Sequence, residues 1–238
     1  MQKFRKLQRQ FVVEGVKMVD ELLRSSFEVI RIYATENWIN TIGKVATSGF
    51  ANIQQITHSE LQRISQMKSP NEVLAIVKIP DNESERLIFD DFVLMLDQIA
   101  DPGNLGTIIR IADWFGIRTI ICSPDTVELY NPKVIQATMG SVFRVHVHYA
   151  SLPEVIQNNG SGLPVYGALL DGENIFQQQL SKKAILVIGN ESHGISDAVR
   201  SLIDYPVKIP SMDSGAESLN ASVATAVMCA EFRRGFWI

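Results

Sequence analysis

Three short segments of this sequence concentrate side chains that could bind or activate a small molecule. One ends in Asn104-Leu-Gly-Thr-Ile-Ile-Arg110, and another is Gly189-Asn-Glu-Ser-His-Gly194. The last runs through residues 210–220 and closes with Ser218-Leu-Asn220. Glycines permit sharp turns and close backbone approach, and convergent polar groups orient ligands. Each segment is therefore either a tight turn or one wall of a binding site.

Each segment also has an ordinary structural explanation. Pro-Gly and Gly-rich stretches form turns, and Ser218 or Asn220 could cap the small-residue helix that follows. However, all three segments directly follow apolar runs that predict strands, at residues 92–96, 184–188 and 207–209. Ligands of open α/β sheets bind beyond the carboxyl ends of the strands. The recurrence of unusual loops at that edge favours one shared binding site.

The positioning elements belong to a chain that divides into two α/β domains. We assign residues 1–80 to a small domain, residues 81–86 to a polar linker and residues 87–238 to a larger domain. Apolar strands alternate with helix-length segments in the larger domain, which predicts a mostly parallel sheet with helices on both faces. Its expected strands are 92–96, 117–122, 142–147, 165–170, 184–188 and 207–209, and its expected helices are 105–115, 132–139, 152–158 and two that begin near 196 and 218.

The small domain shows a mixed pattern. Residues 11–24 have nearly helical apolar spacing, which predicts an amphipathic helix. Strands are expected at 29–33, around 53 and at 72–79. Thr57-His-Ser-Glu60 matches a capping box ahead of a short helix.

Charge is unevenly divided along the chain. The net charge is −4 overall, but it is +4 in residues 1–80 and −8 in residues 81–238. Four cations, Lys3, Arg5, Lys6 and Arg9, stand within the first nine residues. They favour a first domain that holds a polyanion, although a solvated terminus explains the same charges equally well.

Several common classes of site and location are disfavoured. No G-x-G-x-x-G follows a strand, and no Walker lysine, H-E-x-x-H or G-x-S-x-G occurs. His146 and His148 lack a third ligand nearby, so we expect no metal site. Cys122 and Cys229 stand in apolar stretches and are expected to be buried thiols. Without a secretory signal or a run of about 20 apolar residues, a cytoplasmic protein is expected.

The three segments resemble the motifs of the SpoU/TrmH family of RNA ribose 2'-O-methyltransferases. Residues 104–110 match its first motif, N-x-G-x-x-x-R, residues 189–194 resemble its second, and Ile209-Pro210 through residues 218–224 resemble its third. Residues 131–133 and 138–141 are similar to the segment between motifs one and two. The front half is more loosely similar to the ribosomal-protein-like RNA-binding domain often fused before this catalytic domain.

The resemblance implies a fold, a cofactor and an assembly. Members of the family carry a deep trefoil knot, the SPOUT fold, use S-adenosylmethionine and place their site at a homodimer interface. The knot would need Gly189, Gly194 and Gly215 in its tight loops. The residues expected at the cofactor are Gly189, Asn190, Gly194, Ile209, Ser218, Leu219 and Asn220.

The resemblance also implies catalytic and RNA-binding residues. Asn104, Arg110, Glu191, Ser218 and Asn220 form the expected catalytic set, and Arg110 joins Lys3, Arg5, Lys6 and Arg9 at the RNA. A guanidinium does not deprotonate easily, because its pKa exceeds about 12. Our hypothesis is that Arg110 donates hydrogen bonds to the 2'-oxygen while water or a phosphate accepts the proton. The apolar end of the chain, residues 232–238, could serve the dimer contact or the core.

Two departures and three alternatives accompany this interpretation. The third loop is one residue longer than the common form, and Asn71-Glu72 stands where many relatives have Gln-Gly. Large-subunit ribosomal RNA is the expected substrate, with transfer RNA as the alternative. A non-catalytic RNA-binding protein would lack the complete motif set, and a dinucleotide oxidoreductase would need the absent glycine fingerprint.

Overall fold

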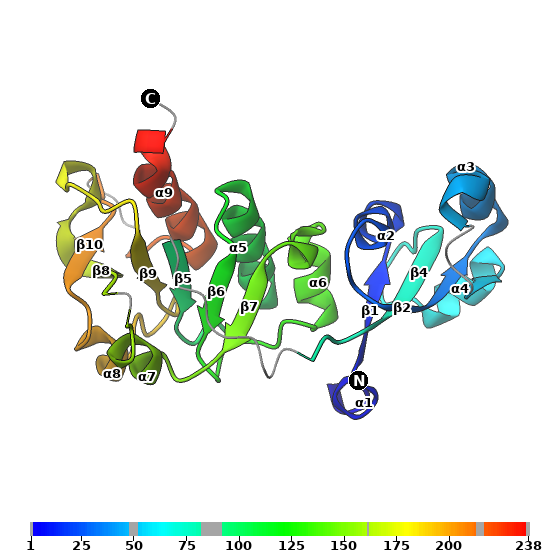
Figure 1. Cartoon of the computed structure of the whole chain (residues 1–238), viewed down its shortest axis with the longest axis horizontal. Helices are drawn as coiled ribbons and strands as arrows, with labels where there is room; N and C mark the ends of the chain where they lie inside the picture. Colours follow the sequence, from blue (N-terminus) through cyan, green and yellow to red (C-terminus); the bar gives the residue numbers. More distant parts are fainter. Residues whose placement is uncertain (1, 48–51, 82–91, 161, 213–216, 237–238) are drawn as a thin grey trace. The chain divides into compact units, whose positions relative to one another are not determined.

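The computed structural model describes residues 2–47, 52–81, 92–160, 162–212 and 217–236 (Figure 1). Contacts divide the chain into two compact units, one of Met1–Glu85 with Tyr130–Phe143 and one of Arg86–Leu129 with Arg144–Ile238. Residues 130–143, which the sequence assigned to the larger domain, thus group with the first unit. Of the predicted linker, residues 81–86, only Asp81 is among the described residues.

The larger unit is built on a fully parallel sheet. Its strand order is β10-β8-β9-β5-β6-β7, and every neighbouring pair is parallel. This confirms the predicted parallel α/β architecture, while the trefoil knot stays a prediction from the resemblance. The strands are β5 (Phe92–Leu96), β6 (Thr119–Cys122), β7 (His146–Tyr149), β8 (Val165–Asn174), β9 (Ala184–Ile188) and β10 (Tyr205–Lys208).

Helices cover both faces of this sheet (Figure 1). Successive residues of a strand point to opposite faces, so an entirely buried strand must be covered twice. On one face the ring of Phe92 lies 4.9 Å from that of Phe232. On the other, Val93 and Met95 share a core with Leu152 and Val199. The helices are α5 (Pro102–Trp114) and α9 (Ala221–Arg233) on the first face and α7 (Leu152–Gln157) and α8 (Asp197–Arg200) on the second.

The first unit contains a four-stranded sheet of order β1-β4-β2-β3. Only β2 and β3 are parallel, and β4 is antiparallel to both of its neighbours. The predicted capping box is confirmed: the Thr57 hydroxyl accepts a hydrogen bond from the Glu60 amide at 3.3 Å, and the Glu60 carboxylate accepts one from the Thr57 amide at 2.8 Å. The elements are α1 (Gln2–Gln8), β1 (Gln10–Glu14), α2 (Val16–Leu23), β2 (Val29–Ala34), α3 (Glu36–Thr47), β3 (Ile53–Gln55), α4 (His58–Ile64), β4 (Val73–Lys78) and α6 (Pro132–Thr138).

Two predicted elements are wrong in part. Residues 11–14 belong to strand β1 rather than to a helix, because Phe11 and Val13 are buried beside β4 and Gly15, at φ +97°, separates the strand from α2. The strand expected at 142–147 begins only at His146, since Ser141–Phe143 forms a 3₁₀ turn after Met139 (φ +51°) and Gly140 (φ +97°). Short turns also occur at Ile175–Gln177 and Arg234–Phe236.

The remaining structural expectations concern the cysteines, the chain end and the membrane. Cys122 and Cys229 are buried free thiols, and burial raises the pKa of Cys229 to about 12. Phe232 lies in the core, where its ring also contacts Tyr166, whereas Trp237 is outside the described residues. No helix in the described part of the chain is long and apolar enough to span a bilayer.

Candidate active site

A hydrogen-bond chain joins the three segments that the sequence singled out. The Asn104 side-chain amide donates from Nδ2 to the Glu191 carboxylate and accepts at Oδ1 from Nδ2 of Asn220, at 2.9 Å. These residues are 87 and 116 positions apart from Asn104 in sequence. The fold therefore brings together the three segments that follow β5, β9 and β10.

Helix capping positions the two asparagines. Asp101 caps α5, and its Oδ1 accepts from the Asn104 backbone N–H at 2.9 Å, while Pro102 occupies the first turn. Asn220 caps α9, and its Oδ1 accepts from the N–H groups of Ser222 and Val223 at 3.0 and 3.3 Å. Because α5 and α9 pack side by side, two helix N-termini meet here. The partial positive charge of these N-termini attracts the negatively charged carboxylate of Glu191 and stabilises it in this position.

The loop after β9 closes on itself through Asn190. Its backbone exchanges two 2.9 Å hydrogen bonds with Gly194, and its side-chain oxygen accepts from the N–H groups of Ser192 and His193 at 2.8 and 3.3 Å. Its Nδ2 donates to the carbonyl of Gln98 at 2.7 Å, which ties this loop to the loop after β5. Asn190 is thus a structural residue of the loop as well as a lining residue of the cavity described below.

Two glycines of this loop are required for different reasons. A Cβ on Gly189 would lie 2.3 Å from the carbonyl carbon of Gly194 and 2.5 Å from the amide nitrogen of Ile195. Gly194 has open space around it but a φ of +70°, which L side chains rarely adopt. The predicted need for glycine at both positions is therefore explained, while Gly215 lies outside the described residues.

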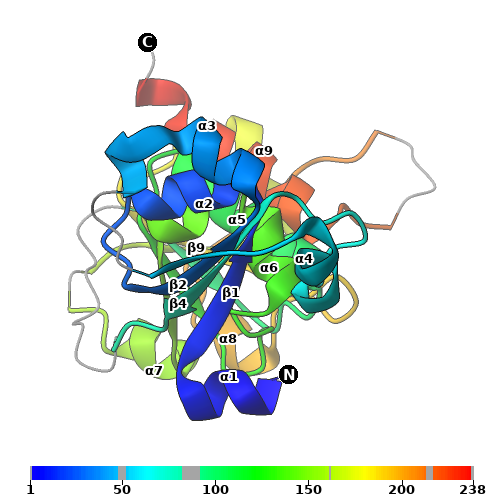
Figure 2. The same cartoon turned by 90° about the vertical axis from the view of Figure 1, so that its right-hand side faces the viewer.

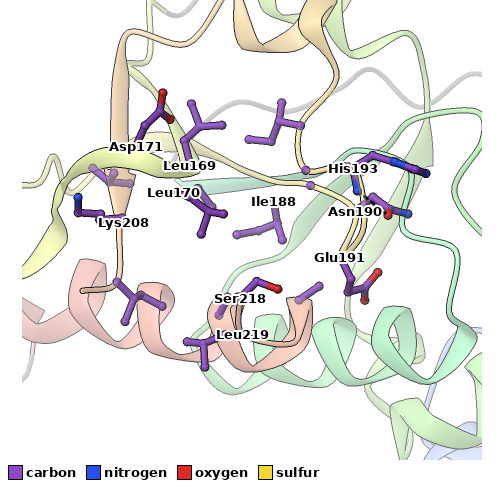
Figure 3. Close-up of a pocket in the computed structure, with 18 of the residues that line it drawn as sticks. Leu169, Leu170, Asp171, Ile188, Asn190, Glu191, His193, Lys208, Ser218 and Leu219 are labelled. Atoms are coloured by element: carbon purple, nitrogen blue, oxygen red, sulfur yellow. Dashed lines mark hydrogen bonds between the residues drawn. The ribbon is translucent and has the colours of Figure 1, made fainter. Parts of the chain in front are cut away.

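A cavity of about 480 Å³ lies between these loops (Figure 3). His193, Asn190 and Glu191 stand at one end, Asp171 and Lys208 stand at the other, and Ile188 is between them. Seven residues predicted for the site line the cavity: Gly189, Asn190, Glu191, Gly194, Ile209, Ser218 and Leu219. Of the described residues predicted for the catalytic set, Asn104 and Asn220 support Glu191 from outside the lining, and Arg110 is also outside it.

One wall of the cavity was missed in the sequence. Residues 168–171 of β8 line it, at a point where the pairing of β8 with β10 jumps from Gly167 opposite Pro206 to Glu173 opposite Val207. A Cβ on Gly172 would lie 2.6 Å from the Val207 nitrogen, so glycine is needed where the strands meet again. Isolated glycines inside a strand mark such bulges and were the available signal.

A buried carboxylate between two of the loops was also missed. Asp97 follows β5 directly and is 2 % exposed. Its Oδ2 accepts a hydrogen bond from the Ser196 backbone N–H at 2.8 Å, which anchors the start of α8 to the loop after β5. A charged residue that immediately follows an entirely apolar strand was the signal in the sequence.

Arg110 and the predicted RNA-binding cations take no part in this hydrogen-bond chain. Arg110 is exposed, and about one and two-thirds helical turns separate it from Asn104, so the two side chains leave α5 in different directions. Lys3, Arg5 and Lys6 stand on α1, whereas Arg9 follows it and forms an ion pair with Asp81 at 2.6 Å. Within one chain, the structure does not bring Arg110 into the cavity.

Comparison with known proteins identifies the family. Residues 91–230 match the model of the SpoU rRNA methylase family. The chain belongs to this family. Residues 1–75 match an MRM3-like substrate binding domain, so the resemblance seen in the motifs is confirmed over both parts of the chain.

Several SpoU relatives are similar over most of their length. A 23S rRNA guanosine 2'-O-methyltransferase of Bacillus subtilis, RlmP, is 28% identical, with 94% of this chain and 88% of the relative aligned. A TrmH-family structure from Porphyromonas gingivalis is 34% identical, has a TM-score of 0.88 and covers 99% of this chain and 94% of its own. An AdoMet-bound rRNA methyltransferase structure from Sinorhizobium meliloti is 26% identical, with a TM-score of 0.86 over 99% of this chain and 91% of its own.

Exchanging Asn104 for Asp tests the hydrogen-bond chain. The variant Asn104→Asp keeps the shape but replaces the amide donor with a carboxylate that faces Glu191. Because a hydrogen bond to a charged group is worth about 1.5–3 kcal/mol, we expect the melting temperature to fall by several degrees in calorimetry. Asn37 donates to Glu72 in the same way on an exposed surface, so Asn37→Asp is the matched control and should have a smaller effect. Equal shifts for both variants would contradict the central role of Asn104.

Alanine substitutions at Gly189 and Gly194 should reduce the free energy of unfolding by different amounts. Gly189→Ala places a methyl group against fixed backbone, and we expect a loss of about 1–3 kcal/mol or more in denaturant unfolding. Gly194→Ala places an L side chain in a left-handed backbone conformation without a steric clash, and we expect it to lower the free energy of unfolding by about 1–2 kcal/mol. Gly160→Ala is the control, since the nearest atom to its Cβ is 4.0 Å away. A stable Gly189→Ala protein would show that the loop does not close as tightly as described.

Proposed function

We propose that this chain transfers a methyl group from S-adenosylmethionine to a ribose 2'-hydroxyl of large-subunit ribosomal RNA. The observation that carries the proposal is the Glu191–Asn104–Asn220 hydrogen-bond chain, which unites three SpoU motifs beside one cavity. The 23S rRNA 2'-O-methyltransferase activity of the Bacillus subtilis relative supports the choice of substrate. Relatives named tRNA/rRNA methyltransferases leave transfer RNA as the alternative substrate.

The cavity fits the proposed cofactor. Its volume of about 480 Å³ falls within the range of about 300–1,000 Å³ that is typical of small-molecule sites. Apolar side chains, among them Leu169, Ile209 and Leu219, line it beside the backbone of residues 189–195. We propose that the apolar groups enclose the adenine and that backbone N–H and C=O groups of the loop recognise its edges. The AdoMet-bound relative from Sinorhizobium meliloti supports this assignment.

The residues of the chain have separate tasks in the proposed reaction. When bound, S-adenosylmethionine supplies an electrophilic methyl group on a sulfonium. Asn104 and Asn220 hold the Glu191 carboxylate at one end of the cavity, where it orients polar groups of the substrate. Apolar walls exclude water, which strengthens the electrostatic interactions inside. Arg110 donates hydrogen bonds to the 2'-oxygen as negative charge develops there, and water or an adjacent phosphate accepts the proton.

Arg110 performs this task at the contact between two copies of the chain. Two observations support a homodimer: Arg110 is exposed and does not line the cavity of its own chain, and Trp114, one turn further along α5, is 83% exposed. An exposed indole beside a functional cation is typical of an interface that a partner covers. The reactive hydroxyl would then lie between the Arg110 of one copy and the cavity of the other.

The first unit binds the RNA in this proposal. Its match to a substrate binding domain and the cations Lys3, Arg5 and Lys6 on α1 support this role. Phosphate contacts of this kind provide affinity without sequence preference. A ribosomal RNA substrate also locates the proposed activity in the cytoplasm.

Two measurements test the function. Titration calorimetry should detect binding of S-adenosylmethionine and none of NAD; the reverse result would favour the oxidoreductase alternative. Mapping of 2'-O-methyl groups in total RNA from a deletion strain and its parent should reveal one lost site in large-subunit ribosomal RNA. Loss of a site in transfer RNA would select the other substrate, and an unchanged map with cofactor binding absent would indicate a non-catalytic RNA-binding protein.

Substitution of Arg110 separates catalysis from cofactor binding. Arg110→Lys keeps the charge but loses the planar pair of donors, and we expect kcat to fall roughly 10²- to 10³-fold. The Kd for S-adenosylmethionine should not change, because Arg110 is outside the cavity lining. The same exchange at the exposed Arg118 is the control. Near-normal turnover of Arg110→Lys would refute the proposed donor geometry.

A further inference from the structure

The first unit contains a second, smaller cavity that the proposed methyl transfer does not use. Its volume is about 190 Å³, and its lining includes Phe11, Val12, Ile76 and Pro132. Phe11 is buried, and its ring lies 4.6 Å from that of Tyr130 in the same unit. The apolar side of this cavity therefore includes a side chain that is packed into the core of the unit.

Polar and aromatic side chains complete the lining. Arg5 and Gln8 come from α1, Gln10 opens β1, and Gln66 follows α4. Phe4 lines the cavity as well, although 68% of its surface is exposed. An aromatic ring held at the surface beside a cavity is available to a ligand rather than to the core.

Gln66 is held in place by a buried carboxylate. Glu14, at the end of β1, is 8% exposed and accepts hydrogen bonds from the Ser65 hydroxyl and from the Gln66 backbone N–H, the latter at 3.1 Å. The backbone at Gln66 is therefore fixed before any ligand arrives. A preorganised group loses less conformational entropy on binding.

Charge identifies the kind of ligand. The first thirteen residues hold four cations and no carboxylate. Lys3, Arg5 and Lys6 belong to α1, the helix at the N-terminus in Figure 2, which contributes Phe4, Arg5 and Gln8 to the cavity lining. A polyanion would be attracted to this helix. An apolar peptide could use the apolar floor, but it would offer no hydrogen-bond partners to the side-chain amides of Gln8 and Gln66.

We propose that this cavity binds one unpaired base of the RNA substrate. At about 190 Å³ it is smaller than the roughly 300–1,000 Å³ of sites for drug-sized ligands, which suits a single ring system. Phe4 and the guanidinium of Arg5 stack on the base, and the side-chain amides of Gln8 and Gln66 bind its edge. Lys3 and Lys6 bind the adjoining phosphates. The proposal rests on RNA being the substrate, and it adds a base-recognition site distant in sequence from the methyl-transfer motifs.

Leu7 provides a matched control for Phe4. Both side chains are large, apolar and exposed on α1, at 71% and 68%, but only Phe4 lines the cavity among these two described residues. Loss of nonspecific surface area would therefore affect the variants Phe4→Ala and Leu7→Ala equally. Loss of base stacking would affect only Phe4→Ala.

The experiment measures fluorescence anisotropy of labelled 12-nucleotide RNAs with the full-length protein. The probes are oligo(rA), oligo(rU), oligo(rC), oligo(rG) and an abasic oligomer of the same length and charge. The wild type should bind at least one base-bearing probe about 5- to 100-fold more tightly than the abasic probe, the range expected for stacking of a base. Phe4→Ala and Gln66→Ala should reduce this ratio several-fold, and Leu7→Ala should preserve it. The salt dependence should not change in Phe4→Ala, because no phosphate contact is removed.

Each outcome has a definite meaning. Equal affinity of the wild type for abasic and base-bearing probes, or equal ratios in Phe4→Ala and Leu7→Ala, would overturn the base-binding site. Thermal melting of each variant verifies folding, and Gln66→Ala tests the site independently of α1. A protein that keeps its base preference but methylates no RNA would refute the proposed function alone. Normal methylation with an unchanged ratio in Phe4→Ala would refute only this inference.

Discussion

The candidate site depends on a single side-chain amide that bonds in two directions. Asn104 donates to Glu191 and accepts from Asn220, so its donor and acceptor ends distinguish the two partners and fix its orientation. A carboxylate or an aliphatic side chain at this position cannot do both. Separate capping bonds, from the Asn104 N–H to Asp101 and from the Ser222 and Val223 N–H groups to Asn220, start the two packed helices. The two asparagines therefore hold the carboxylate near the positive ends of both helices.

Irregular backbone geometry creates the cavity that lies beside this hydrogen-bond chain. The loop after β9 folds against itself so closely that Gly189 has no room for a Cβ, and the irregular pairing of β8 with β10 moves residues 168–171 into the opposite wall. The cavity is thus made by backbone that departs from regular sheet structure, which leaves N–H and C=O groups near a ligand. Side chains contribute the apolar lining and charged groups at its two ends, among them Glu191 at one end and Asp171 and Lys208 at the other, an arrangement suited to a neutral aromatic ring joined to a charged group.

Charge separates the tasks of the two units. Residues 1–80 are basic and residues 81–238 are acidic, so a polyanion is attracted to the unit that matches a substrate binding domain and not to the acidic larger unit. Apart from Arg110, the cations assigned to RNA stand on α1 or directly after it. One of them, Arg5, lines the smaller cavity together with side-chain amides and an aromatic ring. In the proposed function, affinity and base preference come from the same surface, and Arg110 acts separately at the ribose hydroxyl.

The sequence by itself determined the parallel α/β class, the three motif segments and their family. Entirely apolar strands and short motifs are local patterns, so they can be recognised without knowledge of how the chain packs. It also determined the capping box at Thr57, since all its atoms lie within four residues. Tertiary structure alone decided that residues 11–14 pair with β4 instead of extending a helix, and that residues 130–143 group with the first unit. It also decided that residues 168–171 form a wall of the cavity and that Asn104 is the partner of both Glu191 and Asn220. These features depend on pairs of residues far apart in the chain, whose distances are set by strand register and helix packing rather than by local preference.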